Sequence, residues 1–318
     1  MIELRWRGGG TQKWGRMTEG ITGFHHLGVI SRILDDTARR YEELGFVLTP
    51  ASLPEFPLVP DGEPQPVGVA NRNAVFRNGY LEILGVVDAL RWSSISTDQR
   101  GPFDIDKPLT RYEGLHVMHF DADNLDDLRS KLATEGLQPS PVRPFQRRVE
   151  TPEGTDVMRA RCISFAPEIN PEALFQIVQH DTPHLALQPR FMTHRNGALA
   201  LSAAILCVDD PEAVAARYAR YANRPVEQCG PLHIVGLGEV RLVIIKGLDL
   251  PKCFPGEAAP TTPYFAGFAV SADLDQTSAF LSSQAVPFQS TDHRIVVSAR
   301  DACGSMIVFE RSEGDMLS

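Results

Sequence analysis

A histidine pair and a glutamate carry most of the chemistry that this sequence suggests. His25 and His26 begin an apolar run, GFHHLGV, that is predicted to be a strand, and neighbouring side chains on a strand point to opposite faces. At most one of the two histidines therefore faces a given cavity. Glu82 lies between Leu81 and Ile83 in a second predicted strand, GYLEILG, and a buried carboxylate there requires a metal or another cation. The alternatives are a structural histidine and a glutamate that points to solvent.

Arginines form a second group of candidates. Arg72 in ANRN is permanently charged, which makes it a poor metal ligand but suits it to clamp a substrate carboxylate or to pair with Glu82. Five more arginines cluster in the segment RPFQRRVETPEGTDVMRARC, where Arg159 and Arg161 share a strand face. Such a cluster can steer an anionic substrate, although a solvated hairpin face is the favoured interpretation.

The elements that must position these residues follow one pattern, which recurs four times. Each copy has an apolar strand, an acidic cap, an amphipathic helix and further short strands, and the four helices are expected in LDDTARRYEELGF, NLDDLRSKLATEG, DPEAVAARYARYA and DLDQTSAFLSSQ. Gly45 and Gly136 are predicted helix stops, and Pro211 is predicted in a first turn. The sequence therefore predicts an α+β fold of four βαβββ modules, which pair to close around a shared space.

The modules suggest a division of the chain into two domains. We expect a disordered tail over residues 1–20, with Met17 as an alternative start, a first domain over residues 21–195 and a second over residues 196–318. A proline-rich loop over residues 50–66 separates the first helix from the strands after it. It is either a lid or binding loop or a plain surface excursion.

Composition limits the classes of partner. The 318 residues are 43% hydrophobic and carry a formal net charge of -9, so no basic excess is available to bind nucleic acid or an anionic membrane. No apolar run approaches the length of a membrane span. The five scattered cysteines fit reduced thiols in the cytoplasm, and none stands in an activating motif. We expect a cytoplasmic protein that binds a small-molecule substrate.

Several motifs in order give the chain a family resemblance. HHLGVI, YEELGFVLTP, ANRNAVFRNGYLEILGV, LFQIVQHDTP, HRNGA and ACGSMIVFE together resemble the vicinal oxygen chelate superfamily, in its glyoxalase-like domain branch, over about residues 22–311. The resemblance implies two glyoxalase-like half-barrel domains, with a divalent metal in the cup of a paired sheet. The superfamily includes isomerases, ring-cleaving dioxygenases, lyases, epimerases and drug-sequestering proteins, so the fold does not settle the reaction.

In the first module the resemblance makes His26 and Glu82 metal ligands, on the first and last strands. Strand alternation places His26 with Gly28 on one face and turns His25 away. The branch often carries a histidine at the position of Arg72. Because an arginine is a poor metal ligand, we expect Arg72 to bind the substrate. Arg72 and Glu82 are the two expected catalytic residues.

In the second module the first-strand ligand position holds Val117, so the third ligand must come from elsewhere. His180, in a QHDTP motif typical of the branch, is the favoured third ligand, followed by His119. Gln176 replaces either of them or hydrogen-bonds the substrate. We expect His119, Gln176 and Arg159 among the substrate-binding residues.

The second half of the chain shows no matching ligand set. Val243 and Val308 stand near the glutamate position, and the opening strands of both modules lack histidine. This half is expected to be a structural or dimerising partner, so a homodimer is one expectation.

Two histidines and one carboxylate with open positions serve two kinds of reaction. With Fe(II) the site binds a catechol and oxygen, and with Zn, Mn, Ni or Mg it acts as a Lewis acid. The second-shell histidine and tyrosine usual in ring-cleaving members are not assigned, so an isomerase or lyase acting on a small oxygenated molecule is favoured. An extradiol-type dioxygenase is one alternative, and a metal-free sequestering protein in which Arg72 neutralises Glu82 is another.

Overall fold

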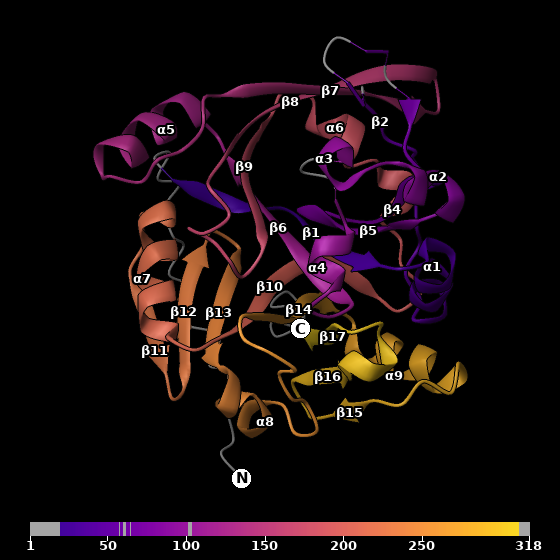
Figure 1. The fold of residues 1–318 in the computed structure, drawn as a ribbon. Coiled ribbons are helices and arrows are strands. Elements are labelled where there is room, and N and C mark those ends of the chain that lie inside the picture. The colour runs from indigo at the N-terminus through magenta and orange to yellow at the C-terminus, as the bar shows by residue number, and fades with distance from the viewer. Residues whose placement is uncertain (1–19, 57, 60–61, 64, 101–103, 312–318) are drawn as a thin grey trace. The chain divides into compact units, whose positions relative to one another are not determined.

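The fold has the four modules that the sequence predicts. The structure is a computed structural model that describes residues 20–56, 58–59, 62–63, 65–100 and 104–311 (Figure 1). The predicted tail, with Met17, lies outside these residues except for Gly20. Within them, helices and strands alternate as an α+β fold of βαβββ modules, which confirms the predicted fold class.

The elements divide between the two halves of the chain. The first half contains β1 (Ile21–Ser31), α1 (Leu34–Glu43), β2 (Glu55–Phe56), β3 (Gln65–Pro66), β4 (Val69–Phe76), β5 (Gly79–Val86), α2 (Ala89–Ser94), α3 (Thr97–Arg100), α4 (Asp106–Leu109), β6 (Gly114–Ala122), α5 (Leu125–Thr134), β7 (Arg143–Thr151), β8 (Gly154–Ser164), β9 (Leu174–His180), α6 (Pro183–Ala186) and η2 (Pro189–Phe191). The second half contains β10 (Ala198–Val208), α7 (Pro211–Ala222), β11 (Val226–Cys229), β12 (Leu232–Leu237), β13 (Val240–Lys246), η3 (Gly247–Asp249), α8 (Leu250–Cys253), β14 (Tyr264–Ala272), α9 (Leu274–Ser283), β15 (Gln289–Ser290), β16 (Arg294–Val297), η4 (Ala299–Asp301) and β17 (Met306–Arg311).

The first module departs from the pattern after its helix. Where the other modules have a strand, Ser52 makes an isolated β-bridge to Asn71 on β4. Farther on, β2 and β3 pair as a short antiparallel hairpin within the proline-rich loop. Prolines remove backbone donors, so this segment pairs only briefly.

The predicted first-turn proline and the two predicted helix stops are found in the structure. Pro211 is the first residue of α7, and Asp210 caps that helix by accepting a hydrogen bond from the backbone N–H of Ala213. Gly45 and Gly136 follow α1 and α5 with φ of 93° and 80°, a conformation that glycine adopts without strain. The predicted stops at both glycines are confirmed.

The chain packs into two compact units, each made of segments distant in sequence. Of the residues that the structure describes, unit 1 takes those within Met1–His25, Met118–Ala186 and Ser202–Ala269, and unit 2 takes those within His26–Val117, Leu187–Leu201 and Val270–Ser318. The predicted division into domains 21–195 and 196–318 follows the order of modules along the chain and stays a prediction.

In unit 2 the sheet of the first module positions the residues of interest. Strands β1 and β5 are parallel, and β4 is antiparallel to β5. Helix α1 packs on β4 and β5 and buries Leu34, Ala38 and Tyr41. This packing covers one face of the sheet and leaves the other face for the polar residues.

In unit 1 an aromatic core joins strands and helix. Phe175 on β9 contacts Phe120 on β6 and both tyrosines of α7, Tyr218 and Tyr221. Helix α7 lies along β12 and β13, as Figure 1 shows. The Tyr218 hydroxyl donates a 2.6 Å hydrogen bond to buried Glu172, which also pairs with Arg217.

Candidate functional site

His26 and Glu82 lie together on one face of the first module. On the parallel strands β1 and β5, His26 pairs with Tyr80 and Gly28 with Glu82, so the two polar side chains project to the same side. The distance from His26 Nε2 to Glu82 Oε2 is 3.8 Å, and the side chains are 9% and 17% exposed. The His26 ring stacks on Tyr80, with 4.7 Å between centroids.

Gly28 is required between these two residues. A Cβ atom at this position would lie 2.7 Å from the Val117 Cβ. The absence of a side chain therefore lets Val117 approach the strand between His26 and Glu82.

Asn71 fixes the orientation of the Glu82 carboxylate. On β4, Asn73 pairs with Glu82 and Asn71 with Leu84, so all four lie on the face that carries His26. The Asn71 side-chain amide donates a hydrogen bond of 2.5 Å to Glu82 Oε1. One carboxylate oxygen is thus held by Asn71, and the other lies nearer to His26.

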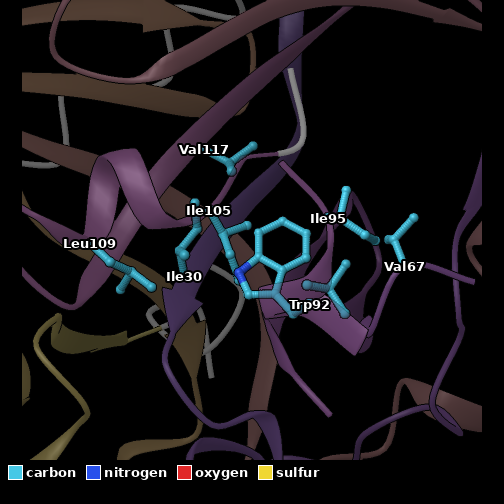
Figure 2. Packing of buried hydrophobic residues seen from close by; sticks show 8 residues of the cluster. Ile30, Val67, Trp92, Ile95, Ile105, Leu109 and Val117 are labelled. Atoms are coloured by element: carbon cyan, nitrogen blue, oxygen red, sulfur yellow. The ribbon is translucent and has the colours of Figure 1, made fainter. Parts of the chain in front are cut away.

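An apolar cluster lies on the same face, farther along the strands. Ile30 on β1 belongs to it, and Leu84 on β5 packs against it. Figure 2 shows the indole of Trp92 at its centre; the buried members are Ile30, Val67, Val69, Trp92, Ile95, Ile105, Leu109 and Val117. Helices α2 and α4 supply Trp92 and Leu109, so this segment covers the face beside Glu82 with apolar side chains.

A buried arginine holds the covering segment together. The guanidinium of Arg100 lies 4.0 Å from the centroid of the Trp92 ring and donates a 2.8 Å hydrogen bond to the Trp92 carbonyl. It also pairs with Asp104 at 3.4 Å and with Asp106, whose carboxylate accepts a hydrogen bond from the indole N–H. Arg100 is thus neutralised where it is buried.

Arg72 lies on the opposite face of the sheet from Glu82. It pairs in register with Ile83, whereas Glu82 pairs with Asn73. Its guanidinium donates hydrogen bonds to Glu42 on α1, at 2.7 Å, and to the Thr49 carbonyl, at 2.9 Å. Arg72 therefore does not pair with Glu82, and its charge is compensated by Glu42.

The candidate histidines of the second module lie in unit 1. His180, at the end of β9, stacks on His25 with 5.0 Å between ring centroids. Strand alternation predicts that His25 faces away from the side that carries His26, and in unit 1 its ring lies against His180, the favoured third ligand. Burial lowers the pKa of His119 to about 3, so this imidazole is neutral at physiological pH.

The remaining candidates of unit 1 are divided between two faces. On β8, Ala160 pairs with His180 and Ser164 with Gln176, so Gln176 shares the face of His180. Arg159 alternates with Ala160, which places the exposed Arg159 on the other face. The roles of His119, His180, Gln176 and Arg159 stay predictions.

The His26 and Glu82 side chains are suited to a divalent metal as a two-ligand set. Imidazole nitrogen and carboxylate oxygen are both common ligands of Zn and Fe(II). Among the residues that the structure describes, no group of three or more His, Cys, Asp or Glu side chains is arranged to hold a metal ion. The pair therefore supplies two donors and leaves the other coordination positions open.

Sequence reasoning missed two residues of this site, Asn71 and Tyr80. Both lie within the motif ANRNAVFRNGYLEILGV. Counting alternate residues from Glu82 places Tyr80 on the same face of the sheet. Continuing the count to Asn71 requires the register of the two strands across the hairpin turn at residues 77–78, which the sequence does not give.

Comparisons with known proteins agree on the fold. The sequence profile described as a glyoxalase-like domain matches residues 24–222. A hypothetical protein from Staphylococcus aureus has a similar structure, with a TM-score of 0.61, 10% identity and coverage of 91% of this chain and 99% of that one. A variant of 4-hydroxymandelate synthase from Streptomyces coelicolor has a TM-score of 0.51, 11% identity and coverage of 92% and 93%.

Other comparisons add little about activity. Methylmalonyl-CoA epimerase from Mycobacterium tuberculosis matches with a TM-score of 0.32, 16% identity and coverage of 51% of this chain and 90% of that one, a similarity too low to support an inference. No protein of curated function matches the sequence. No helix in the described part of the chain is long and apolar enough to cross a bilayer. The profile match over more than half of the chain shows that the protein belongs to the glyoxalase-like domain family of the vicinal oxygen chelate superfamily.

Proposed function

We propose that the protein is a metal-dependent enzyme that acts on a small oxygenated molecule by Lewis-acid chemistry, as an isomerase or a lyase. The observation that supports this most strongly is the 3.8 Å separation between His26 Nε2 and Glu82 Oε2. Metal–nitrogen and metal–oxygen bonds of roughly 2.1 Å each sum to more than this separation, so one cation can contact both atoms.

The residues around the pair would support such an ion. When bound, it would polarise a substrate carbonyl and stabilise an enediolate. Asn71 holds the Glu82 carboxylate through Oε1, and Tyr80 restricts the plane of the His26 ring. The cluster around Trp92 excludes water from part of the face, which strengthens electrostatic interactions there.

Two alternatives have less support. A ring-cleaving Fe(II) dioxygenase would use the same donor types, but likeness to 4-hydroxymandelate synthase at 11% identity shows only a shared fold. The alternative of a metal-free sequestering protein requires that Arg72 neutralises Glu82, but Arg72 pairs with Glu42. That pairing also removes the reason to assign Arg72 to catalysis or to substrate binding beside Glu82.

Metal content after reconstitution tests the proposal. The full chain, purified with chelator and reconstituted separately with Zn, Mn, Ni, Mg and Fe(II), is expected to retain one ion per chain. His26→Ala and Glu82→Ala should each weaken binding by at least roughly 10- to 100-fold, because the loss of even an outer-shell partner costs this much. The measurement is elemental analysis combined with metal titration.

Glu42→Gln is the matched control. Glu42 is a carboxylate of the same unit that pairs with Arg72 on the opposite face of the sheet, so its removal should leave metal affinity unchanged. A wild-type chain that retains no ion, or an equal loss in Glu42→Gln and Glu82→Ala, would contradict the proposal.

A further inference from the structure

The hairpin of unit 1 directs Arg147 and His180 to the same face of their sheet. Arg147 on β7 pairs with Met158 on β8, and His180 on β9 pairs with Ala160, two residues farther along β8. Residues two apart on a strand share a face, so both side chains project to one side. The strand between them carries the buried side chains of Met158 and Ala160 on this face.

Buried donors on this face lack acceptors. Neither ring nitrogen of His180 has a hydrogen-bond partner among the described residues, and the same holds for Nε of Arg147. Burial lowers the pKa of His180, and the nearby Arg159 backbone acts in the opposite direction without meeting hydrogen-bond geometry. Leaving such groups buried and unsatisfied is costly, so this arrangement favours a ligand that can accept hydrogen bonds.

The positive charge on this face comes from the guanidinium of Arg147. Burial and Arg147 both lower the pKa of His180, so its ring, like that of the stacked His25, offers neutral imidazole hydrogen-bonding groups. Asp181 is the carboxylate that acts on His180, and it lies 4.0 Å from Arg161. An anionic ligand could therefore pair with the Arg147 guanidinium and accept a hydrogen bond from an imidazole.

A metal ion fits this group poorly. Within the described part of the chain, His25, His119 and His180 do not form a group arranged to hold a metal ion, and the permanent charge of Arg147 would repel a dication. A guanidinium instead matches the planar pair of oxygens of a carboxylate or a phosphate. We infer that Arg147, His180 and His25, here called the basic cluster, form a binding site for a small oxyanion, the carboxylate or phosphate group of a ligand.

Anion titration of the full-length protein tests this inference. Inorganic phosphate and acetate, titrated separately by calorimetry, are the two probes, and the one that binds more tightly identifies the class of oxyanion. The wild type should bind at one saturable site per chain. Arg147→Gln and His180→Gln should each weaken binding about tenfold or more, as expected for the loss of a charge-assisted hydrogen bond.

Arg148→Gln is the matched control, because Arg148 is the exposed neighbour of Arg147 and projects to the other face of β7. It should leave anion affinity unchanged. If Arg147→Gln does not fold, Arg147→Lys keeps the charge without the planar fork and should still bind more weakly than the wild type. Thermal melting verifies folding.

Three results would overturn the inference. They are the absence of saturable binding of both anions, an equal loss in Arg148→Gln and Arg147→Gln, and a loss of bound metal in His180→Gln with anion affinity intact. The last result would make His180 the third metal ligand predicted from the sequence. The proposed anion site does not include His26 or Glu82. If the protein binds no anion, the metal proposal is therefore unaffected, and if it binds no metal ion, the anion proposal is unaffected.

Discussion

His194 in the HRNGA motif is a structural residue. Its Nδ1 accepts a 3.0 Å hydrogen bond from the Val47 N–H, and its Nε2 lies 3.0 Å from the Val75 carbonyl, to which it donates. Nδ1 can accept only when it carries no proton, so the fold requires the neutral imidazole. Burial lowers the pKa of His194 to about 4, although the bond to Val75 acts in the opposite direction.

Stability should therefore fall as the pH is lowered. The unfolded imidazole, with an ordinary pKa near 6.5, takes up a proton before the folded one does. Between pH 7 and pH 5 this residue alone should remove about 2 kcal/mol from the free energy of unfolding. His194→Gln should reduce that loss by a similar amount in urea unfolding curves, whereas exposed His293→Gln should not. An unchanged pH dependence in His194→Gln would exclude this role.

Individual residues were predicted only where their neighbours in sequence define the environment. Apolar neighbours on both sides of Glu82 indicated a half-buried carboxylate, and the structure places it near His26. The partner of Arg72 is Glu42, which is distant in sequence, and no local pattern identifies it. The His25–His180 stack depends likewise on tertiary packing that strand alternation cannot predict.

At the scale of elements, helices α2, α3 and α4 are the least predictable part of the first module. They are six, four and four residues long, too short to show helical periodicity. Their stability comes from packing around Trp92 and from the ion pairs of Arg100. The four long helices and the longer apolar strands, in contrast, were predicted because their apolar periods are sustained.

Trp92 should be the residue on which this covering segment depends. Trp92→Ala is expected to cost about 3–5 kcal/mol, because it empties the centre of the cluster. Trp92→Phe keeps most of the apolar area and loses the hydrogen bond to Asp106, so it should cost about 1 kcal/mol. Urea unfolding and hydrogen exchange of residues 89–109 measure both effects. Equal costs for the two variants would show that the indole does not support the segment.

At the scale of the whole molecule, four similar modules carry different residues at equivalent positions. On β13, Val243 pairs in parallel register with Ile205 on β10, and both side chains are buried. On β17, Val308 pairs with Val296 and is buried. The repeated fold was predictable because every module repeats the same pattern of apolar residues. The site was less predictable because it depends on single residues, such as a glutamate in one module and a valine at the corresponding position of another. One metal ion per chain, rather than two, is the expected stoichiometry.

A crystal structure of the metal-reconstituted protein, with anomalous scattering measured at the absorption edge of the bound ion, tests the central claim most directly. We predict one anomalous peak per chain, within coordination distance of both His26 Nε2 and Glu82 Oε2. A reconstituted crystal with no peak between these two atoms, or with its peak at other side chains, would contradict the account.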